Sequence, residues 1–292
     1  MEINRVDNPA VFRKIWKIVF GDSDKWLDMY MDGYMDESKA FVLKDEAAAQ
    51  TILSFYEHEA LKLDMAYDNH PAFYAGGSLP GCRKKGNFTA IMEYVTEEIK
   101  KLGHKNASIF PAEEWLFDYY RDKFGFRDFY YVNELLAEPG DIMPWEYEMK
   151  EGRELSLNVV SAAKYSSVRE KILKDTNHLA YGEKLIKLQK ETAMLSHGNL
   201  YEIKGGSGKA LCCIERSSSH KVRITEVLVN PDDFKDVIAL IRKNFHGDLY
   251  EIRYPDFITV DVTGAKRKCV GQIVAFDDTV LPESAYAGFM FD

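Results

Sequence analysis

The chain has 292 residues, of which 46% are hydrophobic and 29% are charged, and this composition is ordinary for a globular protein with material for two cores. Its formal net charge is −9, and it has no long basic run that could bind a nucleic-acid phosphate backbone. We therefore expect no nucleic-acid partner. No stretch approaches the ~18 apolar residues of a membrane span, and the first residues lack the apolar core of a signal peptide. We therefore expect a cytoplasmic protein with no membrane partner, whose acidic surface either favours cationic ligands such as amines or serves solubility alone.

The chain contains four cysteines, whose spacing indicates neither a disulfide framework nor a metal site. There is no CxxC pair, and the adjacent Cys212 and Cys213 would point to opposite faces of a strand. The seven histidines are scattered without an HxxxH spacing. We therefore expect no bound metal, and buried free thiols in a reducing compartment.

The first half of the chain alternates strands with helices. Apolar residues at helical spacing predict two helices within residues 8–35, and Asp22 or Ser23 can cap the second one. The elements predicted next are strands at 40–44, 50–56, 58–66 and 72–79, a turn at 80–88, a helix from Thr89 that Gly103 ends, a strand at 107–110, a helix at 113–123 and a strand at 129–136. This order is typical of an α/β fold with a mixed sheet.

A segment with few periodic apolar positions divides the chain. Residues 138–152 contain Pro139, Gly140, Pro144 and Gly152, so we predict a boundary there, between a domain of residues 1–138 and a domain of residues 152–292. The elements predicted in the second domain are helices over 161–196, a hairpin of 200–204 and 209–215, a strand at 221–229, a helix at 231–245, and strands at 249–253, 271–276 and 286–291. The second domain thus repeats the strand–helix–strand order of the first.

The turn before the helix at Thr89 has the chemistry of an anion site. Arg83, Lys84 and Lys85 precede Gly86, whose missing side chain lets a ligand approach the backbone. The first N–H groups of a helix lack internal partners, and the helix dipole adds partial positive charge there. Such a turn suits a phosphate, although a solvated basic turn with a helix cap explains the same residues.

The segment Arg83-Lys84-Lys85-Gly86-Asn87-Phe88 resembles the pyrophosphate loop of the GNAT acetyltransferase superfamily, which reads Arg/Gln-x-x-Gly-x-Gly/Ala. Residues 120–126, Tyr-Arg-Asp-Lys-Phe-Gly-Phe, resemble the family segment Tyr-Glu-Lys-Leu-Gly-Phe, and residues 19–24 look like the first helix pair of tandem bacterial GNAT proteins. The resemblance covers residues 8–136. It implies an α/β fold of two GNAT-like domains packed together, of which the C-terminal one is degenerate.

Two positions depart from the family pattern. Phe88 stands where the family has glycine or alanine beside the phosphates, and this large side chain fits only if it points into the core. Tyr120 lies five residues before Gly125, whereas the family tyrosine lies four residues before its glycine.

The resemblance also implies an activity. It points to an N-acyltransferase that uses acetyl-CoA as its donor, needs no metal, and acetylates a primary amine of a small molecule or peptide. The pyrophosphate would lie on the backbone of Arg83, Lys84, Lys85, Gly86, Asn87, Phe88 and Thr89, and the pantetheine arm would pair with the strand at Gly77, Ser78 and Leu79.

The same resemblance implies a tyrosine that protonates the leaving thiolate. Tyr120 is the first candidate and Tyr119 the second, although core packing beside Trp115 explains both equally well. A general base is not evident from the sequence. Asp64, Asp68, Glu113 and Glu114 are weak candidates, since acids at a helix start are expected from the dipole alone.

The C-terminal residue Asp292 is a further candidate for the catalytic site. Some two-lobed relatives, the enhanced intracellular survival acetyltransferases, bring a terminal carboxylate into the active site. The alternative is that the last strand merely completes the second sheet.

The second half contains one motif that could mislead. The run Gly205-Gly206-Ser207-Gly208-Lys209-Ala210 is similar to a P-loop, but Ile203 and Ala210 stand where that motif needs Gly and Ser or Thr. Because strand-like segments flank it, we predict a hairpin turn. The second half also has Asn230-Pro231-Asp232-Asp233 in place of a basic turn, and two acids would repel a pyrophosphate, so we expect one donor site per chain.

Three hypotheses follow from these features. The first is an acetyl-CoA-dependent N-acyltransferase, and the second is an inactive GNAT fold that binds acyl-CoA or a partner protein. The third is an aminoacyl-tRNA-dependent transferase, which the acidic charge and the CoA-type loop disfavour. The sequence does not identify the acceptor or the oligomeric state.

Overall fold

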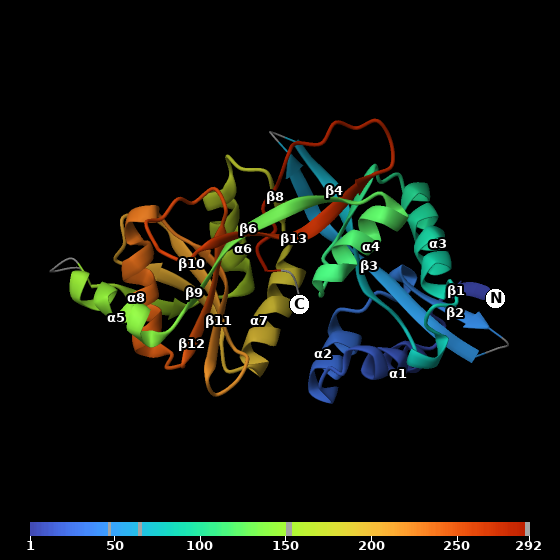
Figure 1. Ribbon diagram of the computed structural model, residues 1–292, viewed down its shortest axis with the longest axis horizontal. Helices are drawn as coiled ribbons and strands as arrows, with labels where there is room; N and C mark the ends of the chain where they lie inside the picture. Colours follow the sequence, from blue (N-terminus) through green and yellow to red (C-terminus); the bar gives the residue numbers. More distant parts are fainter. Residues whose placement is uncertain (46–47, 64–65, 150–153, 290–292) are drawn as a thin grey trace. The chain divides into compact units, whose positions relative to one another are not determined.

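The computed structural model describes residues 1–45, 48–63, 66–149 and 154–289 (Figure 1). The chain forms two compact units, which are described separately here. Unit 1 comprises Met1–Ala60, Asp68–Arg127 and Gln272–Leu281, and unit 2 comprises the remaining residues.

Unit 1 is built on a sheet that positions the predicted turn. Its strands lie in the order β1 (Glu2–Arg5), β2 (Ala40–Asp45), β3 (Ala48–Leu63), β4 (Ala66–Ser78), β5 (Asn106–Ile109) and β13 (Lys266–Ala275), of which Gln272–Ala275 belong to this unit. β1 and β3 run antiparallel to β2, and β13 runs antiparallel to β5. β4 and β5 are parallel, because helix α3 connects them.

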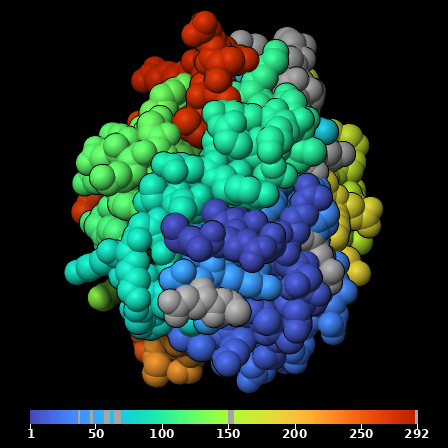
Figure 2. Space-filling model, turned by 90° about the vertical axis from the view of Figure 1, so that its right-hand side faces the viewer, coloured from blue at the N-terminus to red at the C-terminus, as the bar shows by residue number. Residues whose placement is uncertain are grey.

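Helices cover both faces of the unit 1 sheet. One face carries α1 (Pro9–Phe20) and α2 (Asp24–Gly33), which are capped by Asn8 and Ser23, and aromatic residues of both helices contact Tyr74 of β4. The other face carries α3 (Asn87–Lys101) and α4 (Glu114–Phe124), whose apolar residues form one core with Phe41, Leu53 and Phe73. In Figure 2 the N-terminal segment (blue) and the segment around α3 (teal) lie at the exposed surface.

Unit 2 repeats this plan. Its strands lie in the order β13, β6 (Arg127–Ala137), β12 (Leu249–Pro255), β11 (Lys221–Leu228), β10 (Ala210–Arg216), β9 (Asn199–Lys204) and β7 (Ser156–Val159), and β8 (His178–Ala180) pairs with β3. α6 (Ala162–Leu173) and α7 (Glu183–Leu195) cover one face, and α5 (Pro139–Glu148) and α8 (Phe234–Asn244) cover the other. The predicted hairpin joins β9 and β10, which are antiparallel.

The two units share one distinctive step. In unit 1, antiparallel strands lead into β4, which is connected through α3 to the parallel strand β5. In unit 2, the antiparallel strands β9, β10 and β11 lead through α8 to the parallel strand β12. The repeat predicted from element order is therefore present in the backbone.

The structure corrects several predicted elements. Residues 50–56 and 58–63 are not separate strands, because no turn residue breaks the long strand β3, and Ala66 belongs to β4. The segment 138–152 contains helix α5, which Pro139 starts and a Glu138–Asp141 capping box closes. The predicted helices over 161–196 are interrupted by β8. Of the predicted strand at 286–291, Tyr286 forms an isolated bridge and residues 287–289 form no strand, while residues 290–291 lie outside the described residues.

Candidate active site

The predicted anion site is a turn with two left-handed residues. A short 3-10 helix, η2 (Pro80–Cys82), is followed by Lys84 at φ 62° and Gly86 at φ 81°, and α3 then begins at Asn87, two residues before the predicted start. Gly86 caps the helix without a side-chain hydrogen bond. In the described part of the chain, the backbone N–H groups of residues 84–89 donate to no protein acceptor. The turn therefore presents a run of donors to an anion.

Side chains fix this turn to the neighbouring strands. The Asn87 amide is buried and donates to Gln50 Oε1 of β3 at 2.7 Å, and the backbone N–H of Leu79 donates to the Gln50 carbonyl at 2.9 Å. Arg83 Nε donates to the Ser78 carbonyl at 3.3 Å, while Lys84 and Lys85 are exposed. The donors are thus held in place, and two cationic side chains remain at the surface.

Strand β4 has an open edge next to the turn. Among the described residues, only Ala72 and Phe73 of β4 pair with β5, although β4 continues to Ser78. Ala75 has φ 54°, a left-handed backbone that alanine rarely adopts, and such strain accumulates at functional sites. The predicted residues Gly77, Ser78 and Leu79 therefore follow a distorted strand segment that has no β5 neighbour.

Phe88 points away from the turn backbone and toward the core. Its ring lies so close to Gly76 that a Cβ built there would be 3.0 Å from Phe88 Cε2. The ring centroid is 6.3 Å from those of both Tyr119 and Tyr120. The side chain thus fits in the way that the sequence analysis required, and it connects α3 with the tyrosines of α4.

Tyr120 and Tyr119 lie beside Phe88, but their environments differ. The Tyr120 ring is 6% exposed and contacts Phe124 and Phe126, whereas Tyr119 is half-buried. Burial, and to a smaller extent the neighbouring Tyr119, raise the pKa of the Tyr120 phenol well above its ordinary value. Neither hydroxyl has a protein hydrogen-bond partner among the described residues, so Tyr120 is a protonated phenol with an unused donor.

The opposite face of β4 carries an aromatic cluster that sequence reasoning did not assign to the site. Trp16 of α1 lies 5.5 Å from Tyr74, and the rings of Trp26 and Tyr30 stack at 5.3 Å. Val19 at the end of α1 covers Gly77 so closely that a Cβ there would meet Val19 Cγ1 at 2.6 Å. The spacing of these aromatic residues predicted a helix pair, but only the fold brings them to the strand that carries Ala75.

The candidate bases remain unassigned. Asp292 and Asp64 lie outside the described residues, as does the side chain of Asp68. Glu113 accepts a hydrogen bond from the indole of exposed Trp115 at 2.5 Å, and Glu114 is exposed in the first turn of α4. Gln50, Ala75 and Tyr74 were not predicted, since a lone Gln, Ala or Tyr within a strand gives no sequence signal.

The corresponding parts of unit 2 are filled by the protein itself. Asp233, at the turn before α8, is buried and accepts the Ser207 N–H at 2.6 Å and the Ser207 hydroxyl at 2.8 Å. Behind β11, Glu226 is ion-paired with Arg169 of α6 at 3.1 Å and accepts the hydroxyls of Tyr165 and Tyr286. Unit 2 therefore has an acid at its turn and a buried charge cluster in its interior.

Two further properties concern the described residues alone. They contain no group of three or more His, Cys, Asp or Glu side chains that could hold a metal ion. None of their helices combines the length and apolarity needed to cross a bilayer.

Comparison with known proteins supports the fold. No protein-family model matches the sequence, and no curated protein matches it. A GCN5-related N-acetyltransferase from Anabaena variabilis ATCC 29413 has a TM-score of 0.72 at 15% identity, covering 94% of this chain and 73% of that one. Eis1 from Mycobacterium abscessus has a TM-score of 0.64 at 13% identity, covering 95% of this chain and 74% of that one.

A tandem GNAT protein from the clavulanic acid biosynthesis pathway is also similar, with a TM-score of 0.59 at 9% identity, and it covers 96% of this chain and 100% of that one. At these identities the comparison bears on the fold. The chain has the GNAT fold in two GNAT-like domains, and the predicted fold class is confirmed.

Proposed function

We propose that this protein is an acetyl-CoA-dependent N-acyltransferase with a single donor site, in unit 1. One observation carries the proposal: the N–H groups of residues 84–89 have no protein acceptor, and they lie next to the open edge of β4. A pyrophosphate satisfies donors of this kind, and an extended pantetheine arm can pair with a free strand edge. Lys84 and Lys85 add positive charge in a chain whose net charge is −9.

The acyl transfer would proceed by direct attack. The lone pair of a neutral primary amine forms a bond to the thioester carbonyl carbon, and the C–S bond then breaks. A backbone N–H of β4 stabilises the oxyanion, and the Tyr120 hydroxyl gives its proton to the departing thiolate. The acceptor nitrogen loses its proton to water or to a base, which also restores the proton of Tyr120.

The acceptor would be a small molecule or a peptide that carries the amine. Trp26 and Tyr74, the half-buried members of the aromatic cluster on the α1–α2 face of β4, suit an amine with an apolar body, while Trp16 and Tyr30 are buried behind them. We place the reaction in the cytoplasm, because none of the four cysteines, all among the described residues, forms a disulfide. No feature of the turn calls for a nucleic acid or a membrane.

The substitution Gly86→Glu tests the donor site. It places a carboxylate among the N–H donors, so we expect it to abolish CoA binding measured by calorimetry. Gly103→Glu is the matched control, because Gly103 also has positive φ and open space but lies at the other end of α3. Unchanged CoA affinity in Gly86→Glu would refute the proposed site.

Turnover separates catalysis from binding alone. We expect the protein to release CoA from acetyl-CoA in the presence of at least one amine of a panel. Tight CoA binding without turnover on any amine would instead favour an inactive acyl-CoA-binding fold. Absence of both would favour a transferase that uses another donor.

A further inference from the structure

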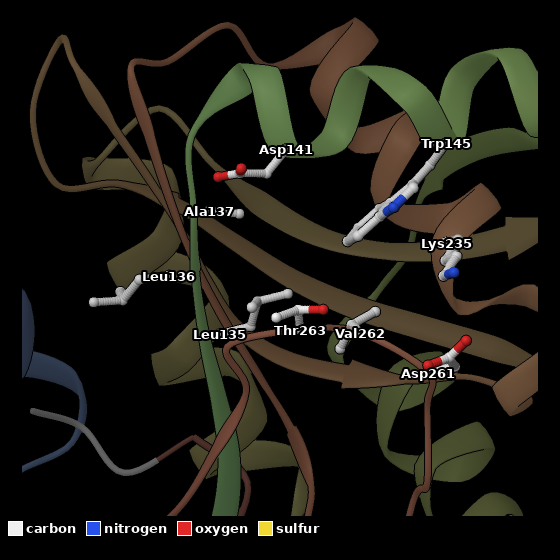
Figure 3. Close-up of a pocket in the computed structure, with 9 residues that line it drawn as sticks. All are labelled: Leu135, Leu136, Ala137, Asp141, Trp145, Lys235, Asp261, Val262 and Thr263. Atoms are coloured by element: carbon white, nitrogen blue, oxygen red, sulfur yellow. The ribbon is translucent and has the colours of Figure 1, made fainter.

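The residues that line one cavity all belong to unit 2, and none of them belongs to the donor turn. The cavity has a volume of about 410 Å³ and is bounded by the end of β6, helix α5, the start of α8 and the loop after β12. Figure 3 shows how these elements surround it, with the Trp145 ring extending from α5 into the space above Val262 and Thr263. This space is large enough for a small organic ligand.

The floor of the cavity is apolar. Leu135 and Ala137 of β6 are buried, and Trp145 and Val262 are partly buried against the same hydrophobic core. The Trp145 indole N–H has no protein acceptor in the described part of the chain. A ligand could therefore bury an apolar group against the indole and still satisfy one polar donor.

The rim of the cavity carries both signs of charge. Lys235 of α8 is half-buried, Asp261 is exposed, and neither forms an ion pair or a hydrogen bond with another described residue. Asp141 uses one carboxylate oxygen to accept the Glu138 N–H at 2.8 Å, and its other oxygen has no described donor. The cavity thus combines a cation and two carboxylates that do not neutralise one another.

Neighbouring charges of the same elements behave differently. Glu146, next to Trp145, is ion-paired with Arg242. Asp256, which precedes the loop, is paired with Arg267 at 2.9 Å. These two carboxylates, unlike Asp261, are therefore neutralised by a neighbouring arginine.

We propose that this cavity binds a small zwitterion with an apolar side chain, such as a free amino acid. Lys235 binds the ligand carboxylate, Asp261 binds its ammonium group, and the side chain lies against Trp145 and Val262. Each charged group of such a ligand then has a counterpart of opposite sign on the protein. The proposal does not depend on the acyltransferase activity, because every residue involved belongs to unit 2.

Calorimetry with three related probes tests the proposal on the full chain without acetyl-CoA. The probes are L-phenylalanine, its amide, which lacks the carboxylate, and N-acetyl-L-phenylalanine, which lacks the ammonium group. Loss of one charge-assisted contact should weaken binding about tenfold, so we expect the zwitterion to bind more tightly than either derivative.

Variants locate the binding. Lys235→Gln should weaken the affinity for L-phenylalanine about tenfold, whereas Lys243→Gln, the matched control on the exposed part of the same helix, should leave it unchanged. Gly86→Glu should also leave it unchanged, which separates this cavity from an amine-acceptor site in unit 1. The proposal is wrong if no probe binds at millimolar concentration, if the amide binds as tightly as the amino acid, or if Lys235→Gln binds like the unmodified chain.

Discussion

At the scale of single residues, the site depends on where two aromatic side chains point. Phe88 lies next to Gly76 and contacts Tyr119 and Tyr120, so its large ring fills the space between α3 and α4. Tyr120 is the more buried tyrosine, and its raised pKa keeps the phenol protonated under physiological conditions. The phenol therefore carries the proton that the departing thiolate needs, and its raised pKa makes it a weaker acid than an exposed tyrosine.

Tyr120→Phe should therefore lower kcat by about 100-fold with little change in KM for acetyl-CoA. The ring and its packing remain, and the lost hydroxyl has no hydrogen-bond partner among the described residues, so the thermal unfolding temperature should hardly change. Because the acid must be protonated and its pKa lies above the ordinary 10.0, Tyr120 should cause no loss of rate as the pH rises to that value. Steady-state kinetics across pH measure both effects.

Tyr119→Phe is the matched control, since Tyr119 is adjacent, half-buried and also next to Phe88. Its kcat should stay close to that of the unmodified chain. A larger loss in Tyr119→Phe than in Tyr120→Phe would reverse the assignment of the acid.

The sequence predicted part of this site for a physical reason. Gly86 and the basic residues before it are local signals, because a glycine between basic residues and a helical pattern can be recognised from the sequence alone. Gln50 is different, because it reaches Asn87 across 37 positions of sequence and no local pattern marks it. Ala75 likewise looks like an ordinary strand residue, and only the backbone shows its positive φ.

At the scale of elements, the C-terminal segment shows what pattern reading misses. Residues 285–289 are all buried, as the residues of a central strand would be. They contact the rest of unit 2 through both backbone and side-chain hydrogen bonds. Leu179 donates its N–H to the Tyr286 carbonyl at 2.8 Å, and Arg169 donates to the Ala287 carbonyl at 3.1 Å. Arg169, which is ion-paired with Glu226, therefore supplies a hydrogen bond to the segment that a neighbouring strand would otherwise supply.

This charge cluster is fully enclosed. Burial is the largest single influence and lowers the pKa of the Arg169 guanidinium. The charges of Glu226, Tyr181, Tyr286 and Glu170 together outweigh it, so the pKa lies above its ordinary value. Burial and the Glu226 carboxylate raise the pKa of Tyr165 and of Tyr286. Every donor around Glu226 thus keeps its proton, which is the condition for a satisfied buried network.

Gly288→Ala should disrupt this anchor. Gly288 has φ 81°, and a Cβ there would lie 2.2 Å from Glu226 Oε1 and 2.9 Å from Arg169 Nη2. We expect the free energy of unfolding, measured by urea titration, to fall by about 3 kcal/mol, from the clash together with the backbone strain. Carboxypeptidase should then digest the C-terminal segment faster.

Gly264→Ala separates the two causes. Gly264 has a similar φ of 88°, but its nearest neighbour would be Leu135 Cδ1 at 3.9 Å. This variant carries the strain without the clash and should lose only about 1 kcal/mol. Equal losses in both variants would mean that the charge cluster does not hold the segment.

At the scale of the whole molecule, chain order and spatial order differ. The sequence predicts a domain boundary at 138–152, between residues 1–138 and 152–292. This boundary remains a prediction. Unit 1 also uses residues from near the C-terminus, since Gln272–Ala275 pair with Asn106–Ile109 of β5. Local periodicity predicted both strands, but no local signal indicates which strand is the partner of which.

A fragment of residues 1–138 should therefore fold poorly by itself. It lacks the strand that pairs with β5, and it loses the fully buried side chains of Gln272 and Ile273, which lie opposite Ile109 and Ser108. An unpaired hydrophobic strand edge also promotes aggregation. We expect this fragment to melt without a cooperative transition in calorimetry, and the same fragment joined by a flexible linker to residues 266–281 to regain one. If residues 1–138 alone melted as sharply as the full chain, the late strand would not be part of the first folding unit, and the donor turn would be carried by a domain that is complete before residue 139.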